Sequence, residues 1–167
     1  MTRFTARSLG MLVFAGLLAT PLSAQAIGEI VQNDTGDTAW ILTSSALVLM
    51  MTLPGLALFY GGLVRAKNVL SVALQTGAVA SIVSLLWIIV GYTLAFGDPT
   101  SGWVGNGRAW MLIELTNVRF ETTIPESAFV LFQMTFAIIA PALMIGAWVD
   151  RARFSWVVIF CALWSLV

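Results

Sequence analysis

Histidine is absent from this 167-residue chain, cysteine occurs once, and charged residues make up only 10% of the sequence. Without histidine, the chain has no imidazole for a metal site or a proton relay. The single cysteine, Cys161, excludes a disulfide within the chain, and its apolar neighbours predict a small buried side chain. A formal net charge of zero and the lack of a basic cluster exclude a nucleic-acid-binding protein, and a mean hydropathy of +0.94 excludes a soluble globular domain.

Charge is missing altogether from four long stretches of the chain, at 38–64, 68–97, 127–149 and 154–167. A helix of about 20 apolar residues crosses the roughly 30 Å hydrocarbon core of a bilayer, so the first three stretches are long enough to span it. We therefore predict an all-α integral membrane protein. Its helices are expected at about 38–63, 69–95, 127–149 and 154–167. The fourth would be cut short inside the membrane, because its 14 residues extend only about 21 Å as a helix.

The first 26 residues have the composition of a secretory signal peptide. Arg3 and Arg7 precede an apolar run at 9–19, and the small residues of a cleavage site follow at 24–26 with the sequence AQA. This pattern predicts a cleaved signal peptide of bacterial type at residues 1–26, followed by a membrane domain at 27–167. A retained signal anchor is the alternative.

The distribution of basic residues predicts the orientation of the helices. The short connections at 64–68 and 150–153 are basic, whereas the long connection at 98–126 is net acidic. The basic residues of the short connections are Arg65, Lys67, Arg151 and Arg153. By the positive-inside rule the short connections lie in the cytoplasm and the long one lies outside. A secreted mature N-terminus agrees, so we expect a multi-pass protein of a bacterial inner membrane with a periplasmic N-terminus.

Small and polar residues in the predicted spans favour packing against other helices. Small residues recur at a spacing of four at Ala73, Gly77 and Ser81 and at Ala142 and Gly146. Such stripes let helix backbones approach closely in a membrane. The second span also carries Gln75, Thr76 and Ser84, which are too polar for a helix that faces only lipid.

Two prolines lie inside the predicted spans. Pro54 and Pro141 each remove one backbone donor and clash with the carbonyl four residues earlier, so each predicts a break or kink. Such breaks are tolerated beside a cavity or a neighbouring helix.

The residues that enzymes use do not come together anywhere in this sequence. The chain has no acid–base pair, nucleophile constellation, phosphate-binding loop or metal cluster, and its predicted spans hold no carboxylate or amine. We therefore expect no catalytic residues, no metal and no cofactor, and favour passage or recognition of a substrate.

The sequence Phe132-Gln133-Met134-Thr135-Phe136 is the most suggestive one for binding. Its two phenylalanines are four residues apart and share a helix face. Two rings near the outer boundary could hold a small cation by cation–π attraction, worth about 2 kcal/mol when desolvated. Plain packing of two core phenylalanines explains the same spacing.

Several sequence motifs together resemble one family. Residues 54–68, PGLALFYGGLVRAKN, closely resemble the first-helix segment of ammonium transporters of the Amt/MEP/Rh family. Residues 132–139, FQMTFAII, followed by PAL at 141–143, are similar to the third helix of that family. The sequence DRARF at 150–154 resembles the loop that follows, and LW at 163–164 the fourth helix. The resemblance runs in order from about Trp40 to the end of the chain.

The resemblance implies a fold of eleven membrane helices, of which this chain would supply the first four. It implies a homotrimer with one pore in each subunit, ammonium or ammonia as substrate, and a PII-type regulator as a possible cytoplasmic partner. Phe136 would belong to a paired-ring gate, and Phe132 would flank the external ammonium site. Tyr60 and Gln133 would lie along or beside the conduction path, and Leu143 would line the pore.

The chain also departs from the family. The Asp and Trp of the external site, a serine acceptor and the paired pore histidines would all lie beyond Val167, and Asp150 stands where the family usually has Glu. We therefore expect a fragment covering about the N-terminal third of a transporter, or a truncated reading frame. A membrane scaffold or ammonium-sensor subunit that does not transport is the alternative function.

Overall fold

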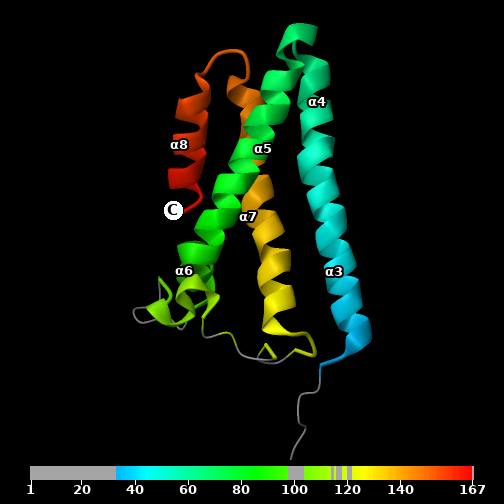
Figure 1. Ribbon diagram of the computed structural model, residues 1–167, viewed down its shortest axis with the longest axis vertical. Helices are drawn as coiled ribbons and strands as arrows, with labels where there is room; N and C mark the ends of the chain where they lie inside the picture. Colours follow the sequence, from blue (N-terminus) through cyan, green and yellow to red (C-terminus); the bar gives the residue numbers. More distant parts are fainter. Residues whose placement is uncertain (1–32, 98–103, 114, 116–117, 120–121, 167) are drawn as a thin grey trace, which may run out of the picture. The chain divides into compact units, whose positions relative to one another are not determined.

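A computed structural model describes residues 33–97, 104–113, 115, 118–119 and 122–166 (Figure 1). The predicted signal peptide at 1–26 lies outside these residues. Three helices in the described part are long and apolar enough to cross a membrane: Thr35–Leu63, Ala66–Phe96 and Glu126–Trp148. A shorter apolar helix, α8 (Phe154–Trp164), follows them. The prediction of three full spans and a short fourth helix is therefore confirmed.

The first span consists of α3 (Thr35–Met50), a π-helical turn η1 (Met51–Gly55) and α4 (Leu56–Leu63). It begins three residues before the predicted start because the Asp34 side chain caps the helix, accepting hydrogen bonds from Gly36 N at 2.6 Å and Asp37 N at 3.0 Å. The π-helical turn contains Pro54, which cannot donate a backbone hydrogen bond. The break predicted at this proline is confirmed.

The second span consists of a 3₁₀ turn η2 (Ala66–Asn68), α5 (Val69–Leu86), a π-helical turn η3 (Trp87–Gly91) and α6 (Tyr92–Phe96). The turn η3 was not predicted, since it contains no proline. Trp87 donates its indole N–H to the carbonyl of Val130 at 3.2 Å. This bond ties the turn to the third span.

The third span is α7 (Glu126–Trp148), which follows a 3₁₀ segment η4 (Gly107–Leu112) in the preceding connection. Pro141 lies inside α7, yet the helix continues through it, so the predicted break is not observed there. Pro141 is buried, and the Cys161 sulfur of α8 lies 4.0 Å from its carbonyl oxygen. Helix α8 thus packs against α7 at the proline.

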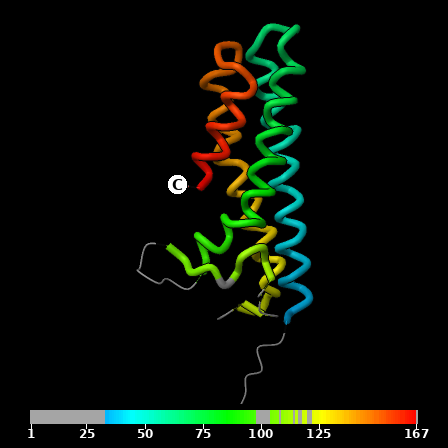
Figure 2. The backbone as a smooth tube through the Cα atoms, turned by 60° about the vertical axis from the view of Figure 1, so that its left-hand side comes forward, coloured from blue at the N-terminus to red at the C-terminus, as the bar shows by residue number. Residues whose placement is uncertain are grey.

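The helices α5 and α7 pack against each other, with α8 on one side of the pair and α3 with α4 on the other (Figure 1 and Figure 2). The buried core comes from α5, α7 and α8. It consists of Val79, Ala80, Val83, Ile138, Ala142, Ile145, Val157 and Cys161. The burial predicted for Cys161 is confirmed, since its side chain has no exposed surface.

Polar side chains on α5 face this interior, as their sequence predicted. Gln75 and Thr76 are buried, and the Thr76 hydroxyl donates to the carbonyl of Val72 at 3.0 Å. The stripe of small residues at Ala73, Gly77 and Ser81 was predicted to lie against another helix, but Gly77 has no such neighbour in the part of the chain that the structure describes. A Cβ atom added at Gly77 would meet nothing within 4 Å, so no helix of the described residues packs closely there.

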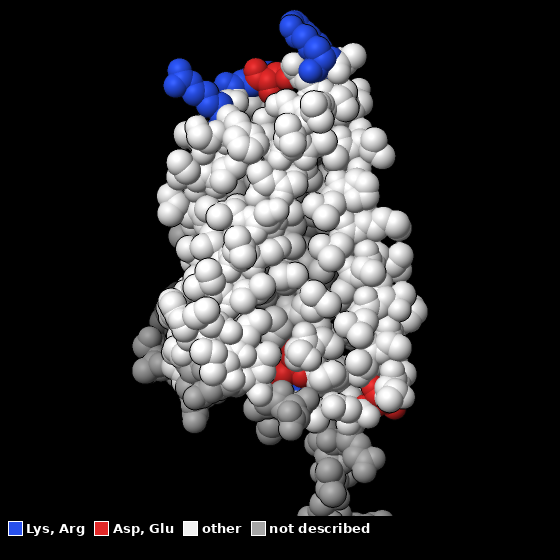
Figure 3. Space-filling model, viewed as in Figure 1, with Lys and Arg blue, Asp and Glu red and all other residues white. Residues whose placement is uncertain are grey.

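The charged side chains lie at the two ends of the described helices (Figure 3). The basic end holds the turns from α4 to α5 and from α7 to α8, with Arg65, Lys67, Arg151 and Arg153. The opposite, acidic end holds the start of α3 and the start of α7. There the backbone N–H of Asp34 donates to Thr123 O at 2.8 Å, and the Thr123 hydroxyl donates to Asp37. These contacts join the first span to the segment before α7.

Candidate functional site

One side of α7 is only partly covered by the described helices, with Phe132 and Ile139 partly buried on it, and three of the predicted site residues, Phe132, Phe136 and Leu143, lie along it. Phe132, Phe136, Ile139 and Leu143 follow one another at spacings of four, three and four residues, which places them on one face. Phe136 is 45% exposed and Leu143 is 50% exposed. The opposite side of α7 is buried, at Thr135, Ile138, Ala142 and Ile145. We call the row of Phe132, Phe136, Ile139 and Leu143 the open face of α7.

The two phenylalanines predicted to act together are in contact. Their ring centroids are 5.1 Å apart and the ring planes meet at 75°, an edge-to-face arrangement. One turn of α7 holds both rings, and on the buried side of that turn the Thr135 hydroxyl donates to the carbonyl of Phe132 at 2.6 Å. Gln133 is partly buried and lies about 100° around the helix from Phe132, beside the open face.

Tyr60 and Leu143 meet at the other end of the open face. The Tyr60 hydroxyl, on α4, donates to the carbonyl of Leu143 at 2.7 Å. Leu143 is 11 residues after Phe132, which corresponds to about 17 Å along the helix. The structure therefore places Phe132, Phe136 and Leu143 on one face of α7, with Gln133 beside that face and Tyr60 reaching its far end from α4.

Gly146 makes room for the tyrosine. A Cβ atom at this position would lie within 3.0 Å of three atoms of the Tyr60 ring. The small residues Ala142 and Gly146 were predicted to let two helix backbones approach. Ala142 is buried in the core formed by α5, α7 and α8, whereas Gly146 faces the Tyr60 side chain of α4, a contact that the sequence does not signal.

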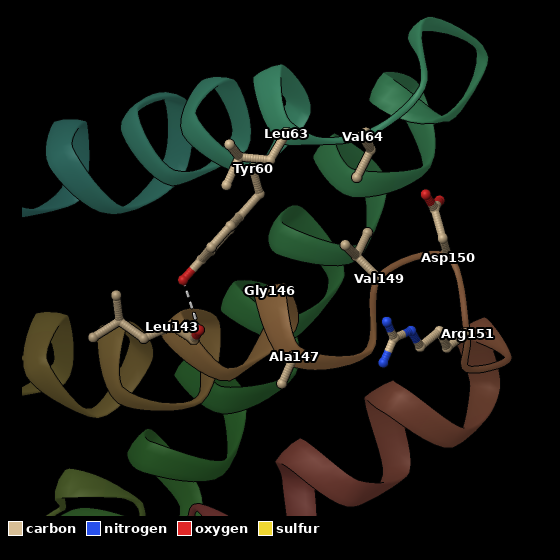
Figure 4. A pocket seen from close by; sticks show the side chains of 9 residues that line it. All are labelled: Tyr60, Leu63, Val64, Leu143, Gly146, Ala147, Val149, Asp150 and Arg151. Atoms are coloured by element: carbon tan, nitrogen blue, oxygen red, sulfur yellow. Dashed lines mark hydrogen bonds between the residues drawn. The ribbon is translucent and has the colours of Figure 1, made fainter.

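A pocket of about 410 Å³ opens beside Tyr60 at the basic end (Figure 4). It is lined by Tyr60, Leu63, Val64, Leu143, Gly146, Ala147, Val149, Asp150 and Arg151. The Tyr60 hydroxyl points at the backbone carbonyl of Leu143, while Asp150 and Arg151 lie toward the helix ends. The pocket thus joins the apolar end of the open face to charged groups at the boundary of the spans.

A hydrogen bond that the sequence did not predict joins the two basic turns. The Asn68 amide, before α5, donates to the Asp150 carboxylate at 2.5 Å. Asp150 follows the end of α7 with a positive φ of 69°. Aspartate tolerates this left-handed conformation better than most residues, which suits a position just after a helix.

Comparison with known proteins decides the family. Residues 39–167 match the Ammonium Transporter Family. The chain belongs to this family. The prediction of a transporter family member, and not an enzyme, is thereby confirmed.

Individual relatives agree with the match. The chain is 40% identical over 161 residues to an ammonium transporter of Aquifex aeolicus, covering 96% of this chain and 37% of that protein. It is 42% identical over 149 residues to an ammonium transporter of Mycobacterium tuberculosis, covering 79% of this chain and 31% of that protein. The chain therefore spans about a third of the length of these relatives.

Solved structures show the same fold. The crystal structure of Candida albicans Mep2 superimposes with a TM-score of 0.69 at 32% identity, covering 81% of this chain and 30% of that one. Saccharomyces cerevisiae Mep2 gives a TM-score of 0.69 at 29% identity, covering 81% and 31%. The described helices of this ammonium transporter family member thus have the all-helical membrane fold of the N-terminal part of those proteins.

The contact between Tyr60 and Gly146 gives a testable prediction. Gly146→Ala should displace the Tyr60 ring, break its hydrogen bond to Leu143, and lower the free energy of unfolding by about 1–3 kcal/mol. Gly77→Ala is the matched control, since nothing lies within 4 Å of its added Cβ atom. It should be neutral or slightly stabilising, because alanine is the better helix former. Thermal unfolding midpoints of both purified variants check this, and equal midpoints would contradict the packing described here.

Proposed function

We propose that this chain forms the N-terminal part of a transporter that moves ammonium or ammonia across a membrane, and that the open face of α7 lines the path. The observation that carries the proposal is the row of residues on this face. It begins with the Phe132–Phe136 pair, continues through Ile139 and reaches Leu143 and Tyr60 at the pocket of the basic end. Membership of the Ammonium Transporter Family supports ammonium or ammonia as the substrate.

The chemistry of these residues suits a small cation that loses its charge on the way. The faces of two aromatic rings attract a cation at the mouth. Beyond them the path becomes aliphatic at Ile139 and Leu143, where a bare cation is costly and neutral ammonia is not. Potassium has no proton to release, so selectivity would come from deprotonation and hydrogen bonding.

Gln133 and Tyr60 have polar groups beside this apolar row. We propose that the Gln133 amide lies beside the path at the Phe132–Phe136 pair. Tyr60 would border the path at the basic end, where its hydroxyl is bonded to the carbonyl of Leu143. Phe132 would flank the external ammonium site, and Phe136 would act as a gate ring. Leu143 would line the aliphatic stretch.

The setting of the protein is also a proposal. The four basic residues of the two short turns lie at one end of the spans, which supports a cytoplasmic position for that end. We propose a bacterial inner membrane, with residues 1–26 as a signal peptide and a periplasmic mature N-terminus. By family resemblance we propose a homotrimer, and a PII-type protein as a regulator on the basic face.

Replacing Phe136 separates a gate from plain packing. In the protein expressed from its complete gene, Phe136→Ala should change conduction or selectivity while folded trimer remains in the membrane, because this ring is 45% exposed on the open face. A ring used only for core packing would instead cost about 3–5 kcal/mol on truncation and reduce the amount of protein. The measurement is methylammonium transport per folded trimer.

Phe154→Ala, which truncates an exposed phenylalanine of α8, is the matched control. Wild-type transport per trimer for Phe136→Ala would remove this residue from the site.

The orientation gives a separate prediction. In intact cells, Lys67→Cys at the basic end should resist a membrane-impermeant thiol reagent, whereas Asn106→Cys near the acidic end should react. The native Cys161 is buried and should contribute little background. Labelling of Lys67→Cys with protection of Asn106→Cys would invert the orientation and move the ring pair to the cytoplasmic side.

A further inference from the structure

A guanidinium group sits among aromatic rings at the acidic end of the helices. The central carbon of the Arg119 guanidinium lies 3.6 Å from the centroid of the Phe129 ring on α7 and 5.2 Å from that of Phe96 on α6. The two rings are themselves in edge-to-face contact, with centroids 5.1 Å apart and planes at 84°. Two spans therefore contribute one ring each to the same cation.

Among the residues that the structure describes, two oxygen-bearing side chains also lie near this cation. The Tyr92 hydroxyl donates to the Glu126 carboxylate at 2.5 Å. One guanidinium nitrogen of Arg119 donates to the Tyr92 oxygen at 3.4 Å and lies 4.0 Å from the Glu126 carboxylate. We call Phe96, Phe129, Tyr92 and Glu126 the outer cage.

The members of the outer cage hold each other more tightly than they hold Arg119. The Tyr92–Glu126 bond is short, whereas the contacts of Arg119 with Tyr92 and Glu126 are long. The Arg119 side chain is 26% exposed, so solvent reaches it. The cage is therefore built by the two helices, and Arg119 enters it from the connecting segment.

Rings combined with a carboxylate are a general arrangement for binding cations. The ring faces attract the charge, and desolvation strengthens this attraction. A nearby carboxylate adds a charge-assisted hydrogen bond. Planar guanidinium fits best because it can stack on a ring while donating sideways, and an alkylammonium ion offers the same charge with fewer directed donors.

The position of the cage relates it to the open face of α7. Phe129 is seven residues before Phe136, so the two rings lie on the same side of the helix. It is also three residues before Phe132, which places it about 4.5 Å nearer the acidic end. A cation in the cage would stand one turn beyond the ring pair.

We propose that the outer cage is a cation-binding site for guanidinium and alkylammonium ions, and that Arg119 occupies it as a competitor tethered in the same chain. A free cation enters only when Arg119 leaves. Arg119 thereby weakens binding of external cations at this end of the α6–α7 pair. This inference does not depend on transport, since binding can be measured without it.

Removal of the tethered competitor tests the proposal. The protein expressed from its complete gene is purified, and guanidinium chloride from zero to about 20 mM is added against sodium chloride of equal ionic strength. In Arg119→Ala, guanidinium should raise the thermal unfolding midpoint in a saturable way, with half-saturation at about millimolar concentration. Wild-type protein should need at least about twofold more guanidinium or show no rise, because a tethered competitor whose effective concentration equals the millimolar half-saturation value doubles that value, and a higher effective concentration raises it further.

Two further variants make the result specific to the cage. Phe129→Leu, combined with Arg119→Ala, keeps an apolar side chain but removes the ring and should abolish the saturable rise. Arg119→Gln also removes the charge and serves where Arg119→Ala is poorly expressed. Methylammonium chloride should act as guanidinium does, at higher concentration. The proposal is wrong if guanidinium has no saturable effect on either Arg119 variant, or if the Phe129→Leu double variant responds as strongly as Arg119→Ala alone.

Discussion

Packing of α5 against α7 determines which sides of the helices remain open, and the candidate site lies on such a side. Inside a membrane this packing cannot depend on the hydrophobic effect, because lipid is as apolar as the side chains. It depends on close fit and on internal hydrogen bonds. The buried residues Val79 and Val83 of α5 and Ile138 and Ala142 of α7 provide the fit, and the Trp87–Val130 bond provides one such hydrogen bond. With that side of α7 fixed inward, Phe136 and Leu143 must face the other way.

The same packing explains why the two ends of the open face differ. At the acidic end, aromatic rings from α6 and α7 gather near a carboxylate, so the environment favours positive charge. At the basic end, Tyr60 crosses from α4 to α7 and is held by the space at Gly146. Between the two ends lies the aliphatic side chain of Ile139, and the sequence from Ser127 to Val149 carries no charge. The helix thus presents attraction for a cation followed by a stretch that penalises one.

Much of this could be predicted from the sequence, because membrane spans obey strong one-dimensional rules. The absence of charge located the spans to within a few residues, and Pro54 located the break in the first span. The spacing of Phe132 and Phe136 placed both rings on one face. These features depend on neighbours along the chain, which the sequence displays directly.

The features that could not be predicted depend on contacts between distant residues. The Asn68–Asp150 bond joins positions 82 apart, and Gly146 receives a tyrosine from another span. Helix α8 packs against α7 at Pro141, which no local rule reveals. The outer cage joins Arg119 to residues of two helices, and arginine in a loop is ordinarily a solvated charge. Only the fold places these groups together.

The most direct test of the account is a structure, determined in lipid, of the protein expressed from its complete gene. The account predicts that the open face of α7, from Phe132 to Leu143, borders an internal lumen closed on its far side by other helices. It also predicts ordered density for water or ammonia along Ile139 and Leu143. Direct contact of this face with lipid, or tight packing that leaves no lumen between Phe136 and Tyr60, would contradict the account.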